Sequence, residues 1–278
     1  NFVFSGFHFN DRARGLQQGM QQTDASPALS NAMAQNFSSY ITRQGNASPL
    51  PILFVNSTRM QDGKPGVFST IKLHSLKTER IDICAQMNNK QDVTLACAVV
   101  NGARFPYLSP AGAMCDTSGH WQYFVDGGYF DNSGAGIVHE LLHEVLGLME
   151  TPEYADIKQR VVIRVVHITN SEWGPGIEQG RLHHVNTMKN DLAAPFITLL
   201  GSYSMQTSVN DFRLKNYVQD HEGATDVYLK IPLLKEGESG EAFTMNWVIS
   251  KHVRDKMDSR LDSAGFSTAS QVIKKDFR

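Results

Sequence analysis

Apolar residues recur at helical spacing in several segments of the chain, and these segments predict its helices. Ile137, Leu141, Val145 and Met149 follow one another at four-residue steps, which predicts an amphipathic helix over 133–149. Related patterns predict further helices at 12–20, 29–41, 92–100, 190–217 and 250–261. Ser250 is a favourable N-cap residue for the last of these.

Short runs of branched and aromatic residues lie between these helices and predict strands. The runs cover residues 51–55, 67–71, 80–84, 121–125, 161–168 and 227–231. The run at 161–168 is almost continuously apolar, which is typical of a strand in a sheet that is covered on both faces. Because strands and helices alternate along 278 residues, the pattern predicts one layered α/β domain.

Composition narrows the class of protein. Hydrophobic residues make up 41% of the chain and charged residues 19%, so the chain has enough apolar surface for a core and too little charge for a disordered protein. The formal net charge of -2 gives no electrostatic footprint for nucleic acid, and no nucleic-acid partner is expected. The apolar stretch at 137–149 is broken by His and Glu and is too short to span a bilayer.

The three cysteines add little chemistry. Cys84, Cys97 and Cys115 are too few and too widely spaced for a disulfide framework, and none of them forms a Cys-x-x-Cys metal pair. We therefore expect ordinary thiols at these positions.

The candidate chemistry centres on Asp126. The predicted strand at 121–125 ends at Asp126-Gly127-Gly128, and the carboxyl end of a strand is where open α/β sheets place reactive groups. Two glycines allow a sharp turn and let another segment approach the carboxylate closely, as a base paired with a nucleophile requires. The triplet alone is also typical of a hairpin turn.

The segments on either side of this turn add to the signal. The chain reads Ala103-Arg104-Phe105-Pro106-Tyr107 upstream of the turn and Tyr129-Phe130-Asp131-Asn132-Ser133-Gly134-Ala135 directly after it. Here the sequence resembles the patatin-like phospholipase family, serine–aspartate lipid acyl hydrolases related to cytosolic phospholipase A2. Looser likenesses occur at 10–16, at 54–58, where Asn56 is expected to form a turn, and at 247–250.

The resemblance implies a three-layer α/β fold, with a sheet flanked by helices, in one catalytic domain over 1–278. It implies that Asp126 is the aspartate of a Ser-Asp dyad and that Gly127 and Gly128 shape its turn. Arg104, Pro106 and Asn132 are expected to support the site. The dyad needs no cofactor or metal, and the expected partner is a phospholipid or another acyl lipid at a membrane surface, with the protein bound peripherally.

The nucleophile of that family is a serine in Gly-x-Ser-x-Gly, and this chain contains no such motif. The chain begins with Asn1 rather than Met, and the segments that it shares with the family follow the nucleophile elbow. We therefore expect this chain to be the post-elbow portion, with the serine on an upstream segment. The alternative is a relative that has lost its serine and is inactive.

A second motif competes with this interpretation. His139-Glu140-Leu141-Leu142-His143 matches His-Glu-x-x-His, in which two histidines bind zinc and the glutamate activates water. Such a site needs a third protein ligand, for which Glu150, Glu153 and His167 are candidates. The other interpretation of the motif is the solvated polar face of an amphipathic helix.

Two further alternatives follow from the remaining residues. The chain is a non-catalytic lipid-binding module if the carboxylate has no nucleophile. Aromatic and branched residues are expected either to line an acyl tunnel or to pack in the core; they are Trp121, Tyr123, Phe124, Phe196 and Ile197.

Overall fold

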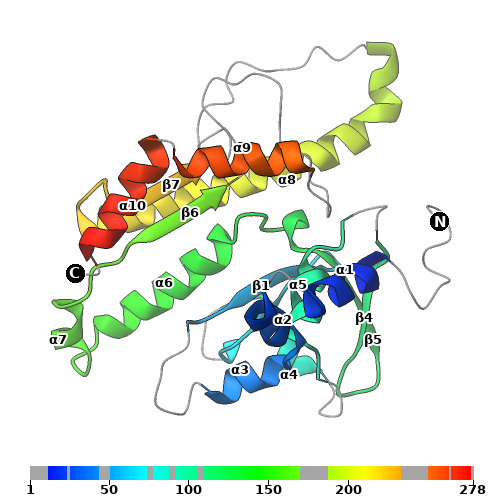
Figure 1. Ribbon diagram of the computed structural model, residues 1–278, viewed down its shortest axis with the longest axis horizontal. Helices are drawn as coiled ribbons and strands as arrows, with labels where there is room; N and C mark the ends of the chain where they lie inside the picture. Colours follow the sequence, from blue (N-terminus) through cyan, green and yellow to red (C-terminus); the bar gives the residue numbers. More distant parts are fainter. Residues whose placement is uncertain are drawn as a thin grey trace. The chain divides into compact units, whose positions relative to one another are not determined.

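The computed structural model describes residues 12–23, 26–43, 51–73, 78–87, 92–105, 109–169, 187–232, 250–262 and 264–276. The chain divides into two compact units, Asn1–Glu144 with Leu200–Thr207 and Val145–Leu199 with Ser208–Arg278. The protein is mixed α/β, with a mixed sheet flanked by helices (Figure 1). The predicted α/β class is confirmed at this level, and a single catalytic domain over 1–278 stays a prediction.

A five-stranded mixed sheet in the order β3-β2-β1-β5-β4 forms the centre of the first unit (Figure 1). Its strands are β1 (Phe54–Arg59), β2 (Pro65–Ser69), β3 (Ile81–Asp82), β4 (Gly112–Cys115) and β5 (Trp121–Asp126). β3 is parallel to β2, and the other neighbouring strands are antiparallel. The strand predicted at 121–125 is confirmed as β5.

The central strand β1 lies further along the chain than the apolar run at 51–55 indicated. It contains Asn56, Ser57 and Thr58, whose polarity hid the strand from a search for apolar runs. Ser57 and Thr58 are nevertheless buried, because β1 pairs with β2 on one side and with β5 on the other. Asn56 therefore lies inside a strand, and its expected role in a turn is wrong.

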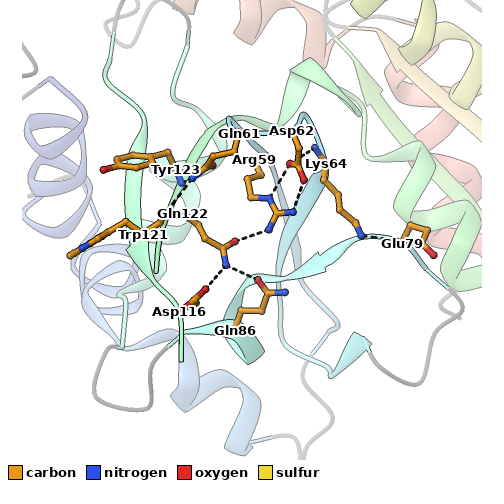
Figure 2. Close-up of polar contacts among 10 residues, drawn as sticks. All are labelled: Arg59, Gln61, Asp62, Lys64, Glu79, Gln86, Asp116, Trp121, Gln122 and Tyr123. Carbon is orange, nitrogen blue, oxygen red and sulfur yellow. Dashed lines mark hydrogen bonds and ion pairs between the residues drawn. The ribbon is translucent and has the colours of Figure 1, made fainter. Parts of the chain in front are cut away.

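Polar side chains join β1 to the start of β5 (Figure 2). Arg59 Nη1 donates to Gln122 Oε1 at 3.0 Å, and Gln122 Nε2 donates to Asp116 Oδ2 at 3.1 Å. These contacts support the antiparallel register that sets Ser57 opposite Asp126. The position of Asp126 is thus defined by pairing along the whole of β5.

Short helices accompany the sheet. They are α1 (Arg12–Gln21), α2 (Pro27–Ala34), α3 (Phe37–Arg43), α4 (Ile83–Gln86) and α5 (Leu95–Gly102). α1 packs on α2 and α5, and α5 packs on β1 and β5. The buried core cluster consists of Phe37, Phe68, Ile81, Ile83, Met87, Ala98 and Phe124. The helices predicted at 12–20 and 92–100 are confirmed as α1 and α5.

The helix predicted at 29–41 is divided into α2 and α3. Gln35 leaves the helical conformation, with φ -71° and ψ 148°, and its carbonyl oxygen accepts a hydrogen bond of 2.9 Å from Leu95 N. Asn36 forms an isolated bridge with Thr94. The N-terminus of α5 therefore interrupts the helix through contacts that local spacing does not contain.

The strand predicted at 80–84 is correct only for Ile81 and Asp82. Asp82 Oδ1 accepts a hydrogen bond of 3.0 Å from Ala85 N and caps α4. An N-cap aspartate ends the strand and starts the helix at Ile83, which is why the alternating pattern overestimated its length.

The second unit contains a two-stranded parallel sheet and several helices. Its elements are α7 (Ala155–Lys158), β6 (Val165–Thr169), α8 (Thr187–Glu222) apart from Leu200–Thr207, β7 (Tyr228–Pro232), α9 (Lys251–Leu261) and α10 (Ala264–Asp276). The helices predicted at 190–217 and 250–261 are confirmed as α8 and α9, and the strand predicted at 227–231 as β7. Ser250 Oγ accepts from Val253 N at 3.3 Å, which confirms its N-cap role.

The strand predicted at 161–168 is shorter than expected and is not covered on both faces. Only Val165–Thr169 is a strand, and it pairs with β7 in a sheet of two strands. Val166 and Ile168 are 42% and 66% exposed. In the part of the chain that the structure describes, no helix has the length and apolar composition needed to cross a membrane.

Candidate active site

Asp126 is the last residue of β5, held there by its backbone. Its N–H donates a hydrogen bond of 3.2 Å to the carbonyl oxygen of Arg104, which follows α5. Ser57, its partner across β1, donates from Oγ to the Val125 carbonyl at 2.8 Å. Sheet pairing on one side and the α5 segment on the other therefore fix the backbone that carries this carboxylate.

The turn after Asp126 is a short 3₁₀ helix, η3 (Gly127–Tyr129), which the aspartate caps by accepting from Gly128 N at 2.7 Å. A Cβ on Gly127 would lie 2.5 Å from the Asn56 carbonyl oxygen. A Cβ on Gly128 would lie 2.7 Å from Asn132 Oδ1 and 2.8 Å from Asp126 Oδ1. Gly127 has no room for a side chain because backbone atoms of Asn56 lie against it, whereas a side chain at Gly128 would displace the Asn132 and Asp126 side chains.

The Asp126 carboxylate is partly buried. Burial raises the pKa of Asp126 above its ordinary value, and the hydrogen bond from Gly128 N offsets part of that rise. Among the described residues no ion pair includes Asp126, and the hydrogen bond from Gly128 N is the one that its side chain accepts. A partly buried carboxylate with a raised pKa is a stronger base than a free aspartate.

The second aspartate of the segment, Asp131, lies in a different environment. Its side chain is 1% exposed, and Oδ2 lies 3.1 Å from Arg80 Nη2. The same oxygen accepts from Ile137 N at 3.1 Å and from Asn56 Nδ2 at 3.3 Å. Asp131 is therefore an internal ion-pair partner that anchors the first turn of α6 (Ala135–Met149).

Arg80 extends this network to α6. Its Nε lies 3.0 Å from Glu140 Oε2, which also accepts from Thr78 Oγ1 at 2.6 Å. A Cβ on Gly136 would lie 2.7 Å from Arg80 Nη2, so the glycine lets the guanidinium approach the helix. Neither Arg80 nor the ion-pair role of Asp131 was predicted from the sequence. An acidic residue just before a helix is a usable capping signal for Asp131, whereas nothing local marks Arg80.

The predicted supporting residues have different positions. Arg104 contacts Asp126 through its carbonyl, while its Nη1 donates to the Pro110 carbonyl at 2.7 Å. Asn132 is exposed and approaches the turn at Gly128. Pro106 lies outside the described residues. The structure thus brings Arg104 and Asn132 to the Asp126 turn.

The His139-Glu140-x-x-His143 motif lies on α6, as predicted. Its glutamate is not simply on a solvated face, because Glu140 is paired with Arg80. His143 has a side chain that is 64% exposed. Among the described residues, no group of three or more His, Cys, Asp or Glu side chains is close enough to hold a metal ion.

Two of the three candidate third ligands of that motif have other partners. Glu150 accepts from Lys158 Nζ at 2.5 Å. His167 Nδ1 shares a hydrogen bond of 2.8 Å with the Tyr228 hydroxyl. Glu153 is exposed.

Comparison with known proteins adds no further constraint, because no protein-family model and no curated protein matches this sequence. The function is therefore argued from the residues and their geometry.

Proposed function

We propose that this chain carries the general base of a lipid acyl hydrolase, of phospholipase A or lysophospholipase type. In this proposal the chain belongs to the patatin-like family, adopts its three-layer arrangement and is the portion that follows the nucleophile elbow. Asp126 is the base, and a serine on a segment outside these 278 residues is the nucleophile. The substrate is a phospholipid or another acyl lipid at a membrane surface, to which the protein binds peripherally.

One observation carries the proposal: the contrast between Asp126 and Asp131. Asp131 is buried in an ion pair with Arg80, and breaking that pair would leave a buried charge without a partner. Asp126, at the strand end, has a raised pKa, and among the described residues it has no cationic partner. Of the two carboxylates in the segment, Asp126 is the one suited to accept a proton.

The chemistry follows from this assignment. The serine hydroxyl transfers its proton to Asp126 as its oxygen attacks the ester carbonyl carbon. The tetrahedral intermediate collapses, the ester C–O bond breaks, and the proton passes from Asp126 to the departing alcohol. Water then attacks the acyl-serine and loses a proton to Asp126. The acyl C–O bond to the serine breaks, the proton passes from Asp126 to the serine oxygen, and a fatty acid is released. No cofactor takes part.

The zinc peptidase alternative has weaker support. The glutamate of its motif has to activate water, yet Glu140 is engaged by both Arg80 and Thr78.

We propose no nucleic-acid partner, because the net charge of -2 provides no excess of positive charge to attract phosphates.

The test is Asp126→Asn in the protein that carries both this chain and the serine, with fatty-acid release from phospholipid vesicles as the assay. Loss of a general base predicts a decrease in kcat of about 100-fold or more. Asp62→Asn, on the exposed β1–β2 turn, is the matched control and should retain activity. Full activity in a folded Asp126→Asn variant would refute the proposal.

A further inference from the structure

A cavity of about 450 Å³ lies in the first unit, lined by residues of the α5 segment and of β4. This volume is in the range of small-molecule sites. Much of its wall is apolar and includes Phe68, Val93, Met114 and Trp121. Trp121 is 56% exposed, and its ring projects away from the Arg59–Gln122 contacts (Figure 2). An apolar ligand that enters the cavity would therefore contact the solvent-exposed indole of Trp121.

Polar groups converge at another part of the same cavity. A Cβ on Gly112 would lie 2.1 Å from Asn101 Oδ1 and 2.9 Å from Arg104 Nε, so both side chains meet above this glycine. Asn101 is 4% exposed, and its Nδ2 has no hydrogen-bond partner among the described residues. The hydrogen bond from Arg104 Nη1 to the Pro110 carbonyl orients the guanidinium.

The charge of Arg104 acts inside the cavity. It favours the thiolate of Cys97, another lining residue, although burial dominates and raises the pKa of that thiol. Asp92 also lines the cavity, but its carboxylate is engaged by Ser38, whose Oγ donates to Oδ2 at 2.5 Å. The Asn101 oxygen lies beside this guanidinium, so Asn101 positions Arg104, and a guanidinium at the wall of an apolar cavity is a favourable partner for an oxyanion.

We propose that this cavity binds an amphipathic oxyanion, a carboxylate or phosphate on an apolar tail, with the anionic group on Arg104, which Asn101 positions. The tail lies along Val93, Met114 and Trp121. Neither Asp126 nor Gly127 and Gly128 line the cavity, so it is separate from the catalytic carboxylate. The assignment does not depend on the hydrolase proposal and is tested without any activity.

The experiment is calorimetric titration of the full chain with four monomeric ligands that share a dodecyl-length tail: dodecanoate, dodecyl phosphate, dodecanol and dodecyltrimethylammonium. One or both anions should bind at least tenfold more tightly than the alcohol, since a charge-assisted hydrogen bond is worth that factor or more. The stronger anion identifies the source, a free fatty acid or a phosphate ester. Trp121 emission should change on binding, and the change should be absent in Trp121→Phe.

Variants then assign the site. Arg104→Gln should weaken anion binding at least tenfold and leave dodecanol binding unchanged. Asn101→Asp should do the same, because the new carboxylate pairs with Arg104, and it provides a second test if Arg104→Gln does not fold. Arg59→Gln is the control for an arginine outside the cavity and should bind like the wild type. Equal affinity for alcohol and anions, a preference for the cation, no binding, or unchanged anion binding in a folded Arg104→Gln would overturn the proposal.

Discussion

Arg80 Nη2 lies 3.1 Å from Asp131 Oδ2, and both side chains are almost completely buried, at 2% and 1% exposed. The guanidinium also lies over the Phe130 ring, 5.7 Å from its centroid. Residues 51 positions apart are thereby joined beneath the turn that presents Asp126. This pair holds the start of α6 and leaves the strand-end carboxylate outside the network.

Arg80→Met should lower the free energy of unfolding by about 3–5 kcal/mol, because it leaves the Asp131 carboxylate buried without its cation. Urea denaturation of the chain measures the change. Lys64→Met is the matched control, since Lys64 pairs with the exposed Glu79 and such pairs contribute little. A loss in Arg80→Met no larger than that in Lys64→Met would show that the buried pair is not a structural anchor.

Gly127→Ala should destabilise the protein by about 1–3 kcal/mol, because the new methyl group meets the Asn56 backbone and the turn has to shift. Gly147→Ala is the opposite case. Gly147 lies within α6 with no atom within 4 Å of its added Cβ, so alanine should stabilise the helix by up to about 1 kcal/mol. Thermal unfolding of both variants checks the sign, and a shift of the same sign in both would contradict the packing described for the turn.

Asp126→Asn should raise stability at pH 7, in contrast to its effect on activity. The raised pKa of Asp126 means that its charged form is less favourable in the folded state than in the unfolded state. The difference in unfolding free energy between variant and wild type should be largest above the raised pKa of Asp126. It should decrease as the pH falls through that pKa and vanish below the ordinary aspartate pKa of about 3.9. Urea midpoints between pH 3 and 8 measure this trend, and a less stable variant at pH 7 would argue against burial as the cause.

We expect the folded state to lose stability in acid because of His167. Burial lowers the pKa of His167, and the neighbouring Asp211 opposes that decrease only in part. The neutral ring is therefore favoured in the folded state, and this stability is present above the ordinary histidine pKa of about 6.5 and lost as the pH falls toward the lower folded value. His167→Gln should flatten the profile of the urea midpoint between pH 5 and 7.5. His143→Gln, on the exposed side of α6, should leave the profile unchanged, and identical profiles for all three proteins would refute the assignment.

Sequence patterns predicted the long, strongly periodic elements well. α1, α5, α6, α8 and α9 were expected from helical spacing, and β5 and β7 from compact runs of branched and aromatic residues. In these segments local preference and tertiary environment agree. α10 and β4 were not predicted.

Failures occurred where a contact distant in sequence decided the outcome. Leu95 divides the helix expected at 29–41 by bonding to Gln35, and pairing with β2 and β5 buries the polar residues of β1. A periodicity search cannot detect either effect, because it weighs only the neighbours along the chain.

By itself, the sequence determined that Asp126 is the candidate catalytic carboxylate. It also determined that Asp126 lies at the end of a strand, before two glycines that permit a tight turn. Only the tertiary structure decided that Asp131, five residues later, pairs with Arg80, while Asp126 has no ion-pair partner in the described part of the chain. It also decided that Asn101 and Arg104 converge over Gly112. The physical reason is that burial and charge pairing depend on distances in space between segments, and local sequence fixes only the conformations that allow those segments to meet.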